Sequence, residues 1–213
     1  MTRVPKILCL YSGGLDSAGA LWKIINDESY SNYQVLIHHV HIVNATGRYY
    51  AEKQAVEQTI PLFRKYTHHQ LYYSSTIMDF NFLAPRVPID ADVYGFVAAN
   101  LLNIDLSIEA IVIGRTLDDK NSGGDSNIQI VDCVEQELLL NNVGRQNYSS
   151  AKCLTPVVDL TKQQIWEMLP DDIRNSTWSC RRPHYKTFPD GKVLSVPCAN
   201  CHACNARTQL LNL

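Results

Sequence analysis

The sequence has no long hydrophobic run and no excess of charge of one sign. None of its apolar stretches approaches the roughly 20 residues of a membrane-spanning helix. Residues 1–6 lack the apolar core of a signal peptide. The formal net charge is −2, so no global field favours nucleic acid or anionic lipid. We therefore expect a cytoplasmic protein with no membrane role and with nucleic acid as an unfavoured partner.

The chain also lacks an internal repeat and the polar bias of a disordered protein. Hydrophobic residues make up 46% of its 213 residues and charged residues 19%, which is enough apolar material for a folded core. The length fits one domain, or one domain with a small appendage.

One stretch near the N-terminus, residues 11–17 (Tyr-Ser-Gly-Gly-Leu-Asp-Ser), has the features of a phosphate site. It follows an apolar run and opens into helical apolar spacing. Adjacent glycines let the backbone approach a ligand, and the first N–H groups of a helix attract an anion. Asp16 beside a phosphate requires a bridging Mg²⁺. The alternative interpretation is an ordinary Gly-Gly turn between a strand and a helix.

This stretch differs from two better-known phosphate loops. It lacks the closing Gly-Lys-Ser/Thr of the P-loop and the spaced glycines of the dinucleotide fingerprint. We predict that it binds a nucleotide, together with residues at two other strand ends. The candidate nucleotide-binding residues are Tyr11, Ser12, Gly13, Gly14, Leu15, Asp16, Ser17, Val43 and Gly114.

Strand-like and helix-like segments alternate along the chain. The patterns predict strands over 33–43, 68–78 and 109–114, and an extended segment over 153–160. They predict helices over 18–25, 48–57 (broken or restarted at Pro61), 90–102, 128–140 and, capped by Asp159 or Thr161, up to Leu169. This alternation predicts an α/β fold, an open parallel Rossmann-like sheet with helices on both faces. Its ligands would bind at the carboxyl ends of the strands.

The role of residues 116–127 and that of the three histidines at 38, 39 and 41 each allow more than one interpretation. Residues 116–127 form a lid, a substrate wall or a solvated surface loop. His39 and His41 share one face of their strand and His38 takes the other, so structural or substrate-lining roles are favoured over metal binding.

The seven cysteines are unevenly placed. Cys9, Cys133 and Cys153 stand singly among apolar neighbours and are predicted to be buried and inert. Cys180, Cys198, Cys201 and Cys204 have the spacing Cys-x17-Cys-x2-Cys-x2-Cys, which suits a closed tetrahedral Zn²⁺ site. An iron–sulfur cluster uses similar ligands. We expect residues 1–170 to form the nucleotide-binding domain and 171–213 a metal-binding segment packed on it.

The loop at 12–17 resembles the SGGxDS loop of the N-type ATP pyrophosphatases, the PP-loop enzymes, which bind the pyrophosphate part of ATP. Together with Ser179-Cys180 and the segment 197–207, it is similar to QueC-type enzymes, the 7-cyano-7-deazaguanine synthases. Residues 155–162 look like that family's Thr-Pro-Leu-x-Asp-Leu-Ser/Thr-Lys segment. Gly47-Arg48 with Glu52 is loosely similar to its Gly-Gln-Arg-His…Glu motif.

The resemblance implies an ATP-dependent ligase that adenylates the carboxylate of a deazaguanine acid. Ammonia or an amine then attacks, giving an amide and finally a nitrile. The implied cofactors are ATP, Mg²⁺ and Zn²⁺, with Asp16, Lys120 and Arg86 as catalytic residues and Lys162 as a further cation or a helix-start residue. A homodimer and a protein partner are compatible with the sequence.

The sequence departs from this family at two places. Residues 118–126 replace its Asp-Tyr-Ser-Gly-Tyr-Pro-Asp-Cys-Arg, and residues 84–88 replace its Pro-Gly-Arg-Asn. Two alternatives therefore stay open. One is a nucleotide-binding subunit of a modification or defence system that has lost turnover, and the other is an RNA-modifying PP-loop enzyme.

Overall fold

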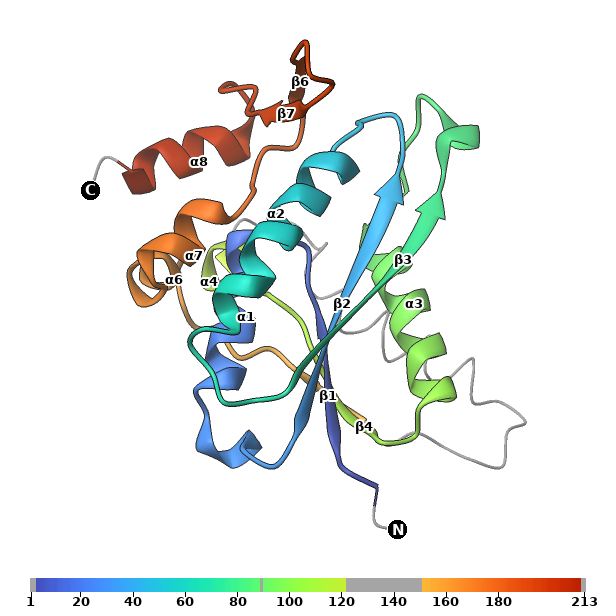
Figure 1. Ribbon diagram of the computed structural model, residues 1–213, viewed down its shortest axis with the longest axis vertical. Helices are drawn as coiled ribbons and strands as arrows, with labels where there is room; N and C mark the ends of the chain where they lie inside the picture. Colours follow the sequence, from blue (N-terminus) through green and yellow to red (C-terminus); the bar gives the residue numbers. More distant parts are fainter. Residues whose placement is uncertain (1–2, 89, 122–150, 212–213) are drawn as a thin grey trace.

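The computed structural model describes residues 3–88, 90–121 and 151–211 (Figure 1). Its centre is a five-stranded sheet with the order β3-β2-β1-β4-β5, in which every neighbouring pair is parallel. The strands are β1 (Lys6–Leu10), β2 (Gln34–Val43), β3 (Leu71–Asp79), β4 (Ile108–Val112) and β5 (Lys152–Leu154). The predicted fold class, an open parallel sheet, is confirmed.

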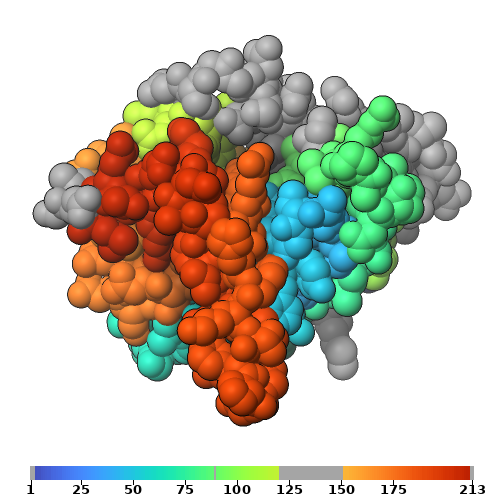
Figure 2. Space-filling model, turned by 90° about the horizontal axis from the view of Figure 1, so that it is seen from above, coloured from blue at the N-terminus to red at the C-terminus, as the bar shows by residue number. Residues whose placement is uncertain are grey.

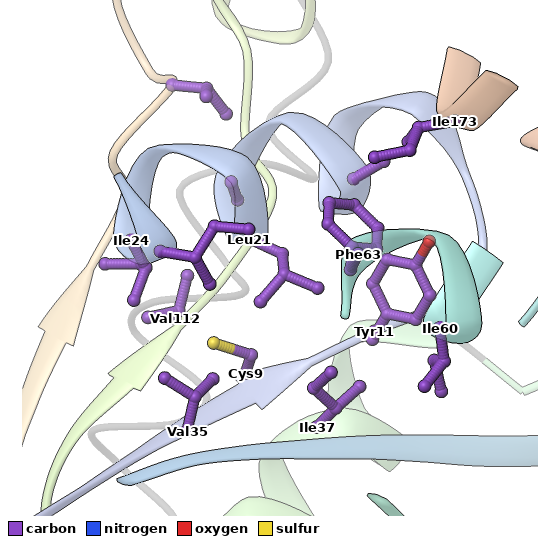
Figure 3. Close-up of a cluster of buried hydrophobic side chains, with 14 of the residues drawn as sticks. Cys9, Tyr11, Leu21, Ile24, Val35, Ile37, Ile60, Phe63, Val112 and Ile173 are labelled. Atoms are coloured by element: carbon purple, nitrogen blue, oxygen red, sulfur yellow. The ribbon is translucent and has the colours of Figure 1, made fainter. Parts of the chain in front are cut away.

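Helices cover both faces of this sheet because β1 is apolar on both. Ile7 and Cys9 point into a core shared with α1 (Leu15–Ile25) and α2 (Tyr49–Phe63), shown in Figure 3. Leu8 and Leu10 point into a second core, shared with α3 (Asp90–Ile104). A strand buried on both faces reads as a continuous apolar run, as residues 7–10 do.

Two short helices, α6 (Lys162–Met168) and α7 (Asp171–Ser176), extend the layer formed by α1 and α2. Thr161 caps α6 in a reciprocal capping box with Gln164, which settles the choice between Asp159 and Thr161. Gly19 of α1 faces Ile165 closely, since an added Cβ would lie 2.5 Å from Ile165 Cγ2. These contacts hold the start of α6 next to α1.

Some predicted boundaries were wrong. α2 continues through Pro61 to Phe63, although a break was predicted; burial of Ala55, Thr59 and Phe63 holds its last turns together. The extended segment predicted over 153–160 is a strand only at its start, after which backbone hydrogen bonds from Val158 and Leu160 close turns. The predicted helix at 128–140 and Cys133 lie outside the described residues.

The remaining elements lie at the periphery of the sheet. Short helices are η1 (Glu28–Tyr30), η2 (Asn81–Leu83) and α4 (Leu117–Asn121). A hairpin of β6 (His184–Thr187) and β7 (Val193–Val196) precedes α8 (His202–Leu211). Figure 1 shows this C-terminal segment beside the end of the sheet to which the strands point. Gln54 of α2 binds the hairpin through Val193 O (2.9 Å) and Ser195 Oγ (2.5 Å). Within the described ranges, no helix combines the length and apolarity needed to cross a membrane.

Candidate functional site

The loop between β1 and α1 is held by its own hydroxyl groups. Ser12 Oγ lies 3.1 Å from Ser17 Oγ and accepts a hydrogen bond from Gly14 N (3.3 Å). Ser17 Oγ also lies 3.1 Å from Gly14 O. Gly13 has φ +78°, a conformation that favours glycine. The loop therefore has the tight strand-to-helix turn predicted for an anion site at the start of α1.

Three other parts of the chain support the loop. The carbonyl of Gly13 accepts a hydrogen bond from Trp178 N (2.8 Å), and that of Tyr11 accepts one from His39 Nδ1 (2.8 Å). Gly114, after β4, is so close that an added Cβ would lie 2.5 Å from Ser17 N. Gly114 therefore allows the close contact between β4 and the loop.

Two predicted nucleotide-binding residues have side chains in the core. Tyr11 is fully buried and its hydroxyl donates to Thr59 Oγ1 (2.7 Å); Leu15 is also buried. Only their backbone groups can serve a nucleotide site. Val43 ends β2, the neighbour of β1, and its carbonyl accepts a hydrogen bond from Phe80 N (2.8 Å).

Asp16 faces a lysine at the start of α6. Lys162 Nζ lies 3.1 Å from Asp16 Oδ2 and 3.3 Å from Asp119 Oδ1. Asp16 Oδ1 is buried with no hydrogen-bond partner among the described residues. Burial raises the pKa of Asp16, opposed by Lys162. Burial disfavours the charged form of Lys162, but Asp16 and Asp119 raise its pKa above the ordinary value.

An unpartnered carboxylate oxygen is a suitable ligand for Mg²⁺, which prefers oxygen donors and usually takes one or two carboxylates alongside phosphate oxygens. Asp16 therefore fits the predicted metal-holding role. Lys162 supplies a fixed positive charge at the same place.

Of the three predicted cations, Lys120, Arg86 and Lys162, the structure places only Lys162 against Asp16 among the side chains that it describes. The side chain of Lys120 lies outside the described residues. Arg86 is exposed in the loop after η2, which follows the edge strand β3. In the sheet β2 lies between β3 and β1, the strand that leads into the loop of Asp16. The described residues offer its side chain no ion-pair partner. Lys162, which the sequence left between a catalytic and a helix-start role, is the cation that contacts Asp16.

A second ionic cluster lies near the carboxyl end of β2. Arg48 pairs with Glu52 (Nε to Oε1, 3.3 Å) and with Asp90, which Arg181 also approaches at 3.8 Å. Burial raises the pKa of Glu52 to about 7, although Arg48 lowers it. The sequence suggested Arg48 and Glu52 through the family motif, but Asp90 only as a helix cap. The cluster links α2, α3 and the C-terminal segment.

The C-terminal segment lies directly beside this cluster. Figure 2, which looks down on the sheet from this end, shows residues from 171 onward next to those following β2. The Tyr185 hydroxyl donates to Gly47 O, and its ring contacts Tyr50 edge-on at 5.7 Å. Residues far apart in the sequence therefore share one surface.

The four C-terminal cysteines converge as predicted. The Sγ atoms of Cys180, Cys198, Cys201 and Cys204 all lie within 4.8 Å of one another. Cys180 Sγ accepts hydrogen bonds from Cys198 N (3.3 Å) and Arg182 N (3.4 Å), and backbone N–H groups that point at sulfur stabilise a thiolate. The four sulfur atoms are close enough together to hold one metal ion or cluster. Cys9 is buried as predicted, whereas Cys153, also predicted to be buried, is only half-buried because it lies in the edge strand β5.

Comparisons with known proteins identify similar solved structures and one family. The most similar solved structures include the U34-tRNA thiolase NcsA from Methanococcus maripaludis with its [4Fe-4S] cluster (TM-score 0.50, 14% identity). That match covers 99% of this chain, which spans 64% of the thiolase. The N,N'-diacetylchitobiose deacetylase from Pyrococcus horikoshii matches with a TM-score of 0.40, 12% identity, and 80% and 73% coverage of this chain and of its own. A search of curated proteins finds no match.

The family comparison is more specific than the structural one. The thiolase, at 14% identity, supports the fold alone. Residues 6–212 match the family described as Queuosine biosynthesis protein QueC. The match runs from β1 through the loop of Asp16 to the last cysteines, so the chain belongs to the QueC family.

Proposed function

We propose that the protein is an ATP-dependent carbon–nitrogen ligase acting on a carboxylate of the 7-carboxy-7-deazaguanine type. The observation that carries this proposal is the family match over residues 6–212. The paired Asp16 and Lys162 beside the start of α1 support it, because they place a metal ligand and a cation at an anion-binding turn.

The proposed reaction begins with adenylation. A carboxylate oxygen of the acid attacks the α-phosphorus of ATP, the bond between the α-phosphorus and the bridging oxygen breaks, and pyrophosphate leaves. Ammonia then displaces AMP from the acyl carbon, losing a proton to give the amide. A second adenylation, on the amide oxygen, uses a second ATP and releases a second pyrophosphate. The amide nitrogen then loses its two protons and the C–O bond breaks, so that the oxygen leaves with AMP as the nitrile forms.

This chain's residues would bind and orient the departing pyrophosphate. The loop N–H groups at the start of α1 would donate hydrogen bonds to the phosphate oxygens, and the Lys162 ammonium, which lies 3.1 Å from Asp16, would supply a positive charge beside them. Asp16 would hold Mg²⁺, which when bound neutralises charge on the phosphate oxygens. Fixed cations and N–H groups act where negative charge develops in the transition state.

The four cysteines would hold Zn²⁺ in a structural role. Four sulfur ligands complete a tetrahedral site and leave no open position for chemistry. An iron–sulfur cluster is the alternative that the same ligands allow. Elemental analysis and the visible absorption of the purified protein distinguish the two, because iron–sulfur clusters are coloured and zinc sites are not.

The test is AMP formation by purified protein with Mg²⁺, ATP, the deazaguanine acid and ammonium. We expect AMP only when the acid is present. Asp16→Asn and Lys162→Met should each lower the rate on the order of 100-fold or more. Lys53→Met is the matched control, because Lys53 is exposed and its pairing with Glu57 at 3.8 Å is weak.

ATP turnover that does not depend on the acid would contradict the proposal. So would unchanged rates in both the Asp16 and the Lys162 variants, provided that thermal unfolding shows each variant to be folded.

A second candidate, a nucleotide-binding subunit without turnover, is favoured by one observation. Residues 118–126 differ from the family's segment at this place. Titration calorimetry that shows tight binding of ATP, combined with no product from any deazaguanine acid, would favour this candidate over the ligase.

A further inference from the structure

The residue that leads into the loop between β1 and α1 is hydrogen-bonded through all of its polar groups. Tyr11 N donates to His38 O (2.9 Å), and Tyr11 O accepts from His39 Nδ1 (2.8 Å). The Tyr11 hydroxyl donates to Thr59 Oγ1 (2.7 Å). Two successive residues of β2 therefore hold the backbone of Tyr11, one through its carbonyl and the other through its side chain.

The ring of His39 is fully buried, and Nε2 has no hydrogen-bond partner among the described residues. The ring meets the His41 ring edge-on at 4.3 Å. Burial lowers the pKa of His39 to about 4, so the ring is neutral at pH 7. Because the Tyr11 carbonyl can only accept, Nδ1 carries the proton. A buried nitrogen without a partner costs free energy, so packing alone would favour an apolar side chain at this position.

The bond from His39 also fixes the direction of the next N–H group. A carbonyl and the N–H that follows it belong to one planar trans peptide and point in opposite directions. Tyr11 O points to His39, so the Ser12 N–H points away from it and lies 3.3 Å from Ser17 Oγ. Ser17 is in the first turn of α1, where an anion would bind. Rotation of this peptide would put an oxygen in place of the N–H.

We propose that His39 is a positioning residue for ATP. Its Nδ1–H holds the peptide between Tyr11 and Ser12 so that the Ser12 N–H donates to the pyrophosphate part of the nucleotide. This inference rests on the proposed function, because it requires ATP in the loop between β1 and α1. His39 itself does not touch the nucleotide, and acts only through the backbone.

The first test is titration calorimetry of the full chain with Mg²⁺–ATP and with Mg²⁺–pyrophosphate. His39→Leu removes the donor and should weaken both affinities about tenfold or more, since a small displacement of a binding group is costly. His39→Asn should bind both within about threefold of the wild type, because its amide nitrogen takes nearly the place of Nδ1. Both variants lose the ring, so only the donor explains a difference of this kind.

Ile37→Val is the matched control for a loss of stability. Ile37 is fully buried and lies on the same face of β2, two residues before His39 (Figure 3). Loss of one methylene should lower the midpoint of thermal unfolding and leave both affinities unchanged. An Ile37→Val variant that loses as much affinity as His39→Leu would attribute the effect to stability and overturn the proposal.

A further variant decides the question if His39→Leu does not fold. His39→Gln places its amide nitrogen near the position of Nε2 instead of Nδ1, so it should bind pyrophosphate about tenfold more weakly than His39→Asn. Equal affinities in the two folded amide variants would overturn the proposal.

The same titrations separate this inference from the proposed function. A wild type that binds neither ATP nor pyrophosphate would overturn the proposed function and this inference with it. Wild-type affinity in a folded His39→Leu variant would overturn this inference alone.

Discussion

At the scale of single residues, the buried histidines of β2 make the free energy of unfolding depend on pH. His38 bonds Ser74 Oγ (2.8 Å) and Thr76 Oγ1 (3.1 Å), and His39 contacts the edge of the His41 ring at 4.3 Å. Burial lowers the pKa of His38 and of His39 to about 4. The unfolded chain, where the pKa is near 6.5, therefore binds more protons than the folded protein between pH 6.5 and 4.

The expected consequence is a free energy of unfolding that falls as the pH drops from 6.5 to 4. His38→Leu should reduce this fall by about 2 kcal/mol, because it removes one group that must stay neutral in the folded state. Urea unfolding at pH 7, 6, 5 and 4 measures the effect. His68→Leu, at an exposed position, is the control and should keep the wild-type pH dependence; an equal change in both variants would contradict the argument.

At the scale of elements, the end of β4 sets the position of the loop between β1 and α1. A Cβ at Gly114 would meet the backbone of Asp16 and Ser17 at 2.5–2.7 Å. Backbone atoms cannot move aside as a flexible side chain can. β4 and the start of α1 must therefore separate if any side chain is introduced at Gly114.

Gly114→Ala should weaken ATP binding about tenfold or more, since small displacements of a binding loop are costly, and should lower the free energy of unfolding by about 1–3 kcal/mol. Calorimetric titration with ATP measures the first effect. Gly19→Ala is the matched comparison: its Cβ would meet the Ile165 side chain, so it should lower stability while keeping ATP affinity close to wild type. If Gly114→Ala binds ATP normally, the close contact does not position the loop.

At the scale of the whole molecule, the C-terminal segment is hydrogen-bonded to the loop that follows β1 near the N-terminus. Trp178 N donates to Gly13 O (2.8 Å), and Trp178 lies two residues before Cys180. Arg207 of α8 donates to Thr177 O (2.8 Å) and lies over the Trp166 ring at 5.4 Å. The cysteine cluster therefore anchors the segment whose Trp178 N–H donates to the loop between β1 and α1.

Removal of the metal with a chelator should loosen residues 177–211 and weaken ATP binding by about tenfold, a typical coupling between sites. Hydrogen exchange detects the first effect and titration the second. Cys180→Ser should reproduce both without a chelator, while Cys153→Ser, a half-buried cysteine outside the cluster, should produce neither. Unchanged exchange over 177–211 after verified metal loss would contradict the anchoring role.

The sequence alone determined the features that depend on local spacing. The apolar run before Gly13-Gly14, the helical pattern after Asp16 and the Cys-x2-Cys-x2-Cys spacing each fix a short stretch of backbone. That was enough for the parallel α/β fold, the loop and the sulfur site, all of which the structure shows. The division at residue 170 and the nucleotide contacts stay predictions.

Only the tertiary structure decided which distant residues meet. It brought Lys162 to Asp16 and Asp90 to Arg48, buried the Tyr11 side chain against Thr59 and kept α2 helical through Pro61. The physical reason is that these outcomes depend on packing between elements, which no local pattern encodes. A lysine at a helix start has the same sequence signature whether it faces water or a carboxylate on a neighbouring helix.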